Sequence, residues 1–316
     1  MAARLTSVSV VVPVYNERDS VRPLTGELLA ALRGSGREIE IIFVDDGSTD
    51  GTAEALAEVV AAEPEVMTVR LRRNFGKAEA LMAGFRTATG DAVVTIDGDL
   101  QDDPAEIPAL LARLEAGAEL VSGWKRDRHD PFGKRAASKV FNGVTRRVTG
   151  VPLHDLNCGL KAYRAEVVRS MALTGDLYRY IPVLAAAEGF RVEEMVVNHR
   201  ERRHGSSKYG FERYVRGFLD LLTITFIGRY RHRPMHLFGG VGLLSFMAGT
   251  LICAYLAVLW LFGEGIGQRP LLLLGVLMIV VGIQLFTIGL VSEMLQRYRM
   301  RSQADEAVAR VERVLR

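Results

Sequence analysis

Two aspartates separated by one glycine, Asp97-Gly98-Asp99, form the sequence feature with the clearest chemical meaning. They follow the short apolar run 92–96, which is rich in β-branched residues and predicts a buried strand. Paired carboxylates at a strand end supply the hard oxygen ligands that Mg²⁺ or Mn²⁺ prefers, and such ions usually complete their shell with substrate phosphates. A metal bound in this way can stabilise a diphosphate leaving group. The alternative is an ordinary turn in which an aspartate caps the backbone.

Two further polar clusters follow apolar runs in the same manner. The carboxylates of Asp45-Asp46-Gly47-Ser48 can accept hydrogen bonds from a nucleotide base or from ribose hydroxyls, or they can cap a following helix. In the segment 13–17, Tyr15 offers an aromatic face for a base and Glu17 a nearby carboxylate. Each cluster is weak evidence by itself, but their order along the chain indicates one binding site.

The elements that must position these residues alternate between strand and helix. Apolar runs predict strands at 8–14, 39–44, 66–71, 92–96 and 120–122, with a late strand at 192–199, and helical patterns lie at 21–33, 52–62, 77–88 and 105–116. Such alternation predicts an α/β fold with an open, mostly parallel sheet flanked by helices. Ligands bind such sheets outside the carboxyl ends of the strands, which is where the polar clusters lie.

Two long apolar segments occupy the last third of the chain, at 237–262 and 271–292. Each can cross a bilayer as a helix, for which about 20 apolar residues suffice. A pair of buried core helices is the alternative, although core helices are rarely apolar on every side at this length. Arginines at 229–233 and 297–301 flank the segments, and the positive-inside rule assigns such flanks to the cytoplasm. The amphipathic stretch 211–230 suits a helix in the membrane interface.

Bulk composition excludes some other classes of protein. The formal net charge of the 316 residues is +3, which is too small an excess to indicate a nucleic-acid partner. The two cysteines, Cys158 and Cys253, lie in a polar and an apolar setting and show no metal-ligand spacing. We therefore expect no disulfide and a reducing, cytosolic environment for the polar part.

The motifs VPVYNE, VDDGS, DGDLQ and HGSSKY, in that order, resemble those of the family-2 inverting glycosyltransferases with the GT-A fold. Together with the two apolar segments, they resemble the polyprenyl-phosphate glycosyltransferases within that family. This resemblance implies a Rossmann-like GT-A catalytic domain at 1–208 and amphipathic interface helices at 209–234. It implies two transmembrane helices within 235–294 and a charged helical tail at 295–316.

The resemblance also implies roles for individual residues. The donor nucleotide would contact Pro13, Tyr15, Glu17, Asp46, Lys77 and Asp97, near the segment of Arg72, Asn74 and Gly76. The metal would be held by Asp99 and Gln101. The residues closest to the reaction would be Asp99, Asp155, Arg203 and Lys208, with Ser207 and Tyr209 in the same loop as the last two. The acceptor phosphate would meet Arg126, Lys134, Arg135 and Ser138.

Several of these roles have alternatives. Asp155 either acts as a base, orients the acceptor, or only caps a turn or pairs with a basic residue. Either Lys134 or Arg135 would bind the acceptor phosphate. Both could instead form a solvated face or touch anionic lipid.

The implied activity is inverting transfer of a hexose from a UDP-sugar to undecaprenyl phosphate, with Mg²⁺ or Mn²⁺, at the cytoplasmic membrane of a bacterium. Both termini would be cytoplasmic, and the tail would permit a homo-oligomer such as a tetramer. Glucose is the favoured sugar, with formamido-arabinose, N-acetylglucosamine, galactose and mannose as alternatives.

Three rival classes remain less favoured. A processive polysaccharide synthase would carry a QxxRW motif, but Trp124 and Trp260 lie in other contexts. A membrane scaffold with a degenerate transferase domain would be free to lose DGDLQ and VDDGS. Both motifs are intact here, which argues against a scaffold. A transporter is disfavoured, because two spans that lack charged interior residues are too few to form a substrate path.

Overall fold

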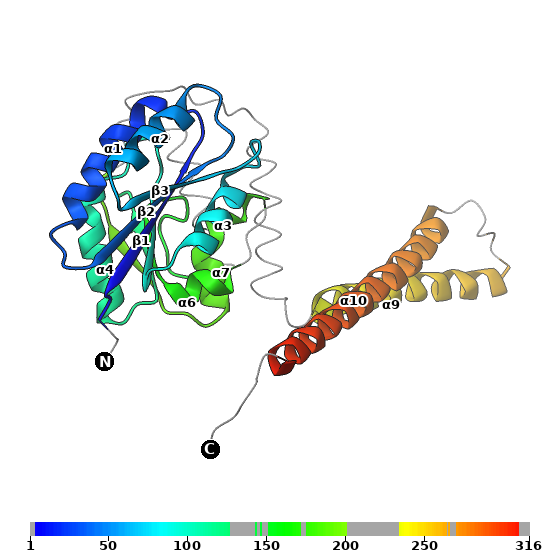
Figure 1. Ribbon diagram of the computed structural model, residues 1–316. Helices are drawn as coiled ribbons and strands as arrows, with labels where there is room; N and C mark the ends of the chain where they lie inside the picture. The colour runs from blue at the N-terminus through cyan, green and yellow to red at the C-terminus, as the bar shows by residue number, and fades with distance from the viewer. Residues whose placement is uncertain are drawn as a thin grey trace, which may run out of the picture. The chain divides into compact units, whose positions relative to one another are not determined.

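The computed structural model describes residues 4–126, 143, 146, 151–171, 175–200, 234–263, 265 and 270–309. The chain forms two compact units, Met1–Thr225 and Phe226–Arg316, and each is considered by itself. In Figure 1 the α/β unit is coloured blue to green and the helical unit yellow to red, following the residue number. The predicted interface helix at 211–230 lies outside the described residues.

The first unit is built on a seven-stranded sheet with strand order β3-β2-β1-β4-β6-β5-β7. The strands are β1 (Ser7–Val14), β2 (Glu38–Asp45), β3 (Val66–Arg70), β4 (Ala92–Thr95), β5 (Leu120–Trp124), β6 (Lys161–Arg164) and β7 (Val192–Val196). Only β6 runs antiparallel to its neighbours β4 and β5, while the remaining pairs are parallel. The predicted mostly parallel α/β sheet is therefore confirmed.

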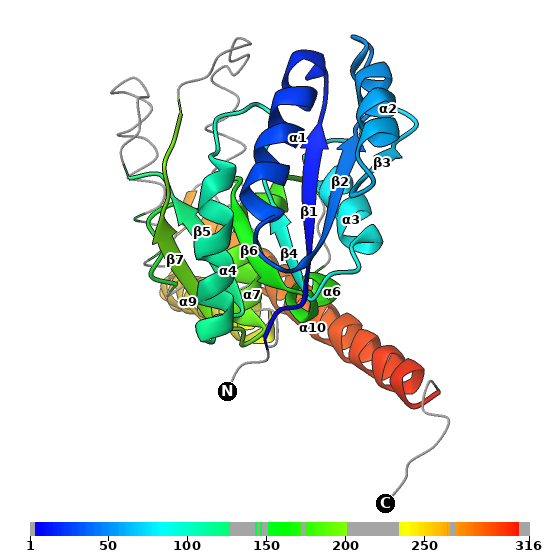
Figure 2. The same ribbon diagram turned by 60° about the vertical axis from the view of Figure 1, so that its left-hand side comes forward.

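Helices cover both faces of this sheet, as Figures 1 and 2 show. One layer contains α1 (Arg18–Leu32), α2 (Thr52–Ala62) and α4 (Ile107–Ala116), and the other contains α3 (Lys77–Thr87), α6 (Ala165–Ser170) and α7 (Ile181–Ala187). Successive strand residues point to opposite faces. Val10 and Val12 accordingly pack in the core beneath α1 and α4, whereas Val11 packs in the core beneath α3. This two-sided burial explains why the strands appear as continuous apolar runs rather than alternating ones.

The predicted strands at 8–14, 39–44, 66–71, 92–96, 120–122 and 192–199 all correspond to observed strands, with bounds shifted by a few residues. The sequence did not predict β6, α6 or α7. The strand β6 has only four residues, Lys161–Arg164, and begins and ends with a basic side chain, so it lacks the apolar run of its neighbours. Because β6 is antiparallel, its first residue pairs with Thr95 and Ser122 and lies at the carboxyl edge of β4 and β5.

The second unit is a hairpin of two long helices, α9 (Pro234–Leu261) and α10 (Pro270–Ala309). The stretches Met235–Leu261 and Pro270–Leu295 have mean hydropathies of 2.1 and 2.7, and only 17% and 11% of the most apolar windows are buried. Within the described residues, both helices are therefore long and apolar enough to cross a bilayer, and most of their apolar surface is exposed.

Glycines bring the two long helices into close contact. A Cβ atom added to Gly242 would lie 2.7 Å from the carbonyl oxygen of Gly282, and one added to Gly249 would lie 2.6 Å from that of Gly275. The Ser245 hydroxyl also donates to the Met278 carbonyl across the pair, at 2.8 Å. Small residues that permit backbone approach are the usual basis of helix packing in lipid, where burial of apolar surface supplies no drive for association.

Candidate active site

The loops after β1 and β2 are joined by hydrogen bonds that the polar clusters themselves supply. Asn16 N donates to Ser48 Oγ at 2.9 Å, and Asn16 Oδ1 accepts from Thr49 N at 2.9 Å. Glu17 N donates to Thr52 Oγ1 at 3.0 Å. Asn16 itself has φ of 57°, a conformation that asparagine tolerates better than most residues. These bonds fix the backbone between Pro13 and Glu17, and Tyr15 remains 46% exposed at the carboxyl edge of the sheet.

The carboxylate of Asp46 is used by the protein's own backbone. Its Oδ1 accepts from Phe75 N at 2.7 Å and its Oδ2 from Gly76 N at 2.9 Å. Only 4% of Asp46 is exposed. The next residue, Gly47, has φ of 72°, and a Cβ there would lie 2.5 Å from the backbone of Arg73. Asp46 therefore holds the loop that leads into α3, and a contact with the nucleotide remains a prediction.

Lys77, the first residue of α3, forms an ion pair with Asp97 at the end of β4. The Lys77 ammonium also lies 5.3 Å from the centre of the Tyr178 ring. Burial by itself would raise the pKa of Asp97, but the charge and hydrogen bond of Lys77 outweigh burial and lower it below its ordinary value. The Asp97 carboxylate is therefore ionised across the physiological pH range.

Glycines make room for the two aspartates. A Cβ on Gly159 would lie 2.5–2.6 Å from the carboxylate atoms of Asp97, and a Cβ on Gly98 would lie 2.8 Å from Val14 Cγ1. The segment before β6 thus packs directly against the Asp97 carboxylate. No sequence signal distinguished Gly159 from other glycines in the chain.

Asp99 and Gln101 lie in the tight loop that follows β4. Asp99 Oδ1 accepts from Gln101 N at 3.2 Å, and Leu100 between them has φ of 62°. Within the described ranges, no three His, Cys, Asp or Glu side chains gather closely enough to hold a metal by themselves. A hard divalent ion that takes one or two carboxylates and completes its shell with substrate phosphates fits this set of oxygen donors.

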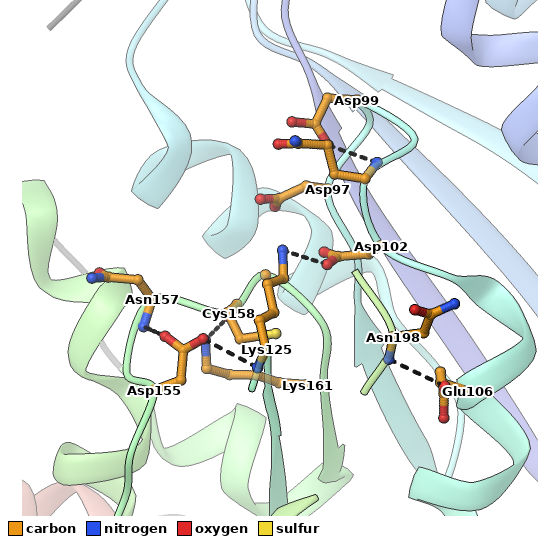
Figure 3. A network of polar contacts seen from close by, with 12 residues as sticks. Asp97, Asp99, Asp102, Glu106, Lys125, Asp155, Asn157, Cys158, Lys161 and Asn198 are labelled. Atoms are coloured by element: carbon orange, nitrogen blue, oxygen red, sulfur yellow. Dashed lines mark hydrogen bonds and ion pairs between the residues drawn. The ribbon is translucent and has the colours of Figure 1, made fainter. Parts of the chain in front are cut away.

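Asp155 is 1% exposed and is held by main-chain donors on both sides. Its Oδ1 accepts from Asn157 N at 3.1 Å and its Oδ2 from Lys125 N at 3.4 Å. The Asp155 main chain is itself held by Glu194 on β7, whose Oε1 accepts from Asp155 N at 2.8 Å. Figure 3 shows Lys125 between Asp155 on one side and Asp102 on the other. Asp155 therefore caps the local turn at Asn157, as one of the alternatives for this residue predicted.

Lys161 is a buried cation at the same edge of the sheet. It is 4% exposed, and its ammonium donates to the main-chain oxygen of Cys158. Burial lowers its pKa, with Asp155 and Asp97 opposing that effect from a distance. The Cys158 thiol is also buried, and burial raises its pKa to about 12, so it is an unreactive thiol.

The structure brings the predicted residues of the strand ends together at one edge of the sheet. These are Pro13, Tyr15, Glu17, Asp46, Lys77, Asp97, Asp99, Gln101, Arg126 and Asp155. The predicted Lys134, Arg135, Ser138, Arg203, Ser207, Lys208 and Tyr209 lie outside the described residues. Sequence reasoning missed Asp102, Lys125, Gly159, Lys161 and Glu194. The available signal for Lys125 was its position just after a predicted strand.

Comparison with known proteins places this chain among enzymes. The family model described as "Glycosyl transferase family 2" matches residues 9–171. The chain is 41% identical over 304 residues to dodecaprenyl-phosphate galacturonate synthase of Rhizobium johnstonii, covering 94% of this chain and 90% of that protein. It is 39% identical over 293 residues to undecaprenyl-phosphate 4-deoxy-4-formamido-L-arabinose transferase of Edwardsiella ictaluri, covering 92% and 89%.

Solved structures share the fold. Glucosyl-3-phosphoglycerate synthase from Mycobacterium tuberculosis, in complex with Mn²⁺, UDP-glucose and glycerol 3-phosphate, superposes with a TM-score of 0.54 at 21% identity. That comparison covers 70% of this chain and 79% of the other. At this identity the likeness supports the GT-A-like sheet and does not identify a substrate.

Proposed function

This chain belongs to glycosyl transferase family 2 and is a glycosyltransferase, and we propose that it transfers a sugar from a nucleotide-sugar to a polyprenyl phosphate at a membrane. The observation that carries the proposal is that Lys125 joins the loop after β4, through Asp102, to the Asp155 carboxylate. Relatives that match nearly the full chain are named for transfer to dodecaprenyl or undecaprenyl phosphate.

On the donor side, the strand ends offer an aromatic ring and several carboxylates to a nucleotide. Tyr15 is exposed, and Glu17 and Asp97 lie on neighbouring strand ends. We propose that Tyr15 stacks on the base and that Asp97, held ionised by Lys77, accepts from the ribose. A uridine diphosphate is the proposed carrier.

Asp99 and Gln101 would hold Mg²⁺ or Mn²⁺, since their oxygens fit a hard cation that also binds phosphates. When bound, such an ion stabilises negative charge on a departing nucleoside diphosphate. The chain's own contribution there is the loop geometry, in which Leu100 adopts a positive φ so that residues 99 and 101 approach each other.

On the acceptor side, a phosphate monoester requires little activation. Its second pKa is about 6, so it is mostly dianionic at neutral pH and can attack without a general base. We propose that Asp155 orients the acceptor rather than removing a proton. Its two oxygens already accept main-chain hydrogen bonds from Asn157 and Lys125, which fix the direction of the carboxylate. Attack opposite the leaving diphosphate inverts the anomeric centre.

The membrane hairpin gives the enzyme access to an acceptor that remains in the bilayer. The exposed apolar surface of α9 and α10 suits lipid contact, and we propose that the hairpin spans the cytoplasmic membrane with the α/β unit in the cytoplasm.

The names of the two reported relatives bear on the choice of sugar. The expected glucose is not the sugar for which the two reported relatives are named, since these are galacturonate and formamido-arabinose. We propose a UDP-linked sugar as the donor, and the following assay identifies it.

The full chain in detergent would be incubated with undecaprenyl phosphate, Mg²⁺ or Mn²⁺, and a panel of radiolabelled nucleotide-sugars. The panel contains UDP-galacturonate, UDP-formamido-arabinose, UDP-glucose and a GDP-sugar. We expect one UDP-sugar to label the lipid fraction, EDTA to prevent labelling, and Asp99→Asn to prevent it while the protein stays folded. Labelling of the lipid by Asp99→Asn at the wild-type rate would exclude the proposed role of Asp99.

A further inference from the structure

Asp102 and Lys125 form a buried ion pair beside the candidate active site. Lys125 Nζ lies 2.6 Å from Asp102 Oδ1, and the two side chains are 12% and 0% exposed. Burial works against the charge of Lys125, but Asp102 and other nearby anions outweigh burial and raise the pKa of Lys125 above its ordinary value. A buried charge is costly unless a partner compensates it, so each member of this pair offsets the cost of burying the other.

The two partners belong to different parts of the site. Asp102 directly follows Gln101 in the loop that carries the proposed metal ligands. Lys125 directly precedes Arg126, the first of the predicted acceptor-phosphate residues. The main-chain nitrogen of Lys125 also donates to Asp155 Oδ2 at 3.4 Å. One lysine thus contacts the donor-side loop through its side chain and the acceptor-side carboxylate through its backbone, as Figure 3 shows.

The loop around Asp102 has a second attachment. Asp102 pairs with His199 in an isolated antiparallel bridge, and Arg200 N donates to the Gln101 carbonyl at 2.9 Å. The Arg200 guanidinium binds Asp103 at 2.8 Å and Glu27 of α1 at 2.6 Å. Tripeptide 101–103 is therefore anchored independently of Lys125, and loss of the ion pair alone would leave the loop attached on that side.

We propose that Asp102 and Lys125 are a positioning pair that holds Arg126 and Asp155 against the Asp99–Gln101 loop, so that the acceptor phosphate meets the donor in line. The inference rests on the proposed function. The pair contacts no substrate itself and acts through its neighbours. Misplacement of reacting groups by about 1 Å can lower the rate about 100-fold, and this pair fixes such a distance.

The test uses the full chain in detergent and four variants: Lys125→Met, Asp102→Asn, Lys125→Arg and the double variant Asp102→Asn/Lys125→Met. Each is assayed for kcat, for KM of undecaprenyl phosphate, for UDP affinity and for Tm. The single variants leave one charge buried without its partner and are expected to be less stable. The double variant removes both charges and is expected to regain much of the wild-type Tm.

The expected result is a fall in kcat/KM for the lipid acceptor of about 100-fold in Lys125→Met and in the double variant, with UDP affinity unchanged. Lys125→Arg keeps the charge and is expected to recover part of the activity. The matched control is Arg22→Met, which breaks an ion pair with Glu58 whose side chains are 67% and 59% exposed. Its kinetic constants should equal those of the wild type.

Full recovery of acceptor kinetics in the double variant would overturn the inference, because a merely structural pair would explain the single variants. A parallel loss of UDP affinity would also overturn it, since the effect would then not be confined to the acceptor side. Variants as active as the wild type would refute this inference and leave the proposed function intact. A wild type that labels no lipid with any donor would refute the proposed function and the inference together.

Discussion

Replacement of Asp46 by asparagine distinguishes a loop-holding role from direct contact with the nucleotide. In the structure both Asp46 oxygens accept main-chain hydrogen bonds, from Phe75 at 2.7 Å and Gly76 at 2.9 Å. Asparagine retains one acceptor oxygen and turns an NH₂ group toward the other donor. The Asp46→Asn variant therefore loses one charge-assisted bond and weakens the second.

The cost follows from these two bonds. A hydrogen bond to a charged group contributes about 1.5–3 kcal/mol, so loss of one and weakening of the other costs about 2–4 kcal/mol. For a unit of this size each kcal/mol changes Tm by roughly 2–4 °C, which gives a fall of roughly 4–16 °C. UDP affinity is also expected to fall, because the loop that Asp46 holds leads into Lys77, the partner of Asp97.

Thermal unfolding of the full chain in detergent measures the stability, and titration with UDP measures the affinity. The control is Asp19→Asn, an exposed carboxylate in the first turn of α1, which should change Tm little. A variant with the wild-type Tm and weakened UDP binding would refute the loop-holding role. It would show that Asp46 acts on the ligand itself.

Two more substitutions test the packing and charge of the site. Gly159→Ala should displace the Asp97 carboxylate, since the added Cβ would lie 2.5–2.6 Å from it, and UDP affinity should fall; Gly26→Ala in α1 has nothing within 4 Å and is the control. Unchanged UDP binding in Gly159→Ala would contradict the assignment of Asp97 to the donor. Lys161→Met should stabilise the fold at neutral pH by about 1–3 kcal/mol, because it removes a buried charge that has no ion-pair partner among the described residues. Since burial lowers the folded pKa of Lys161, the unfolded state binds more protons between that pKa and the unfolded value of about 10.4. Wild-type stability should therefore rise with pH through that window, and the Met variant should lack the rise; a lower Tm for Lys161→Met at neutral pH would contradict this account.

Much of the fold followed from the sequence because the strands are buried on both faces and therefore appear as unbroken apolar runs. The gathering of the candidate site residues could also be predicted, because the carboxyl ends of parallel strands meet at one edge of the sheet. The strand β6 could not be found in this way. Its residues, Lys161–Arg164, include a lysine that is buried in the folded protein. A pattern of apolar residues along the chain cannot predict the burial of a charged side chain.

The supporting residues escaped prediction for a related reason. Glu194 lies on β7 and Asp155 lies before β6, so the hydrogen bond between them depends on the sheet order and not on spacing along the chain. The Asp102–Lys125 pair likewise joins residues whose proximity depends on tertiary structure. Motif spacing predicts candidate ligand-binding groups, whereas the groups that orient them are found only once the fold is known.

The central claim is that the acceptor is a polyprenyl phosphate, and an acceptor comparison tests it most directly. The full chain in detergent would be supplied with its best labelled donor and with undecaprenyl phosphate, undecaprenol or 3-phosphoglycerate in turn. The account predicts label in the lipid fraction with undecaprenyl phosphate alone, because the attacking group is a phosphate held at the membrane. Equal labelling of undecaprenol, or transfer to 3-phosphoglycerate without transfer to the lipid phosphate, would contradict it.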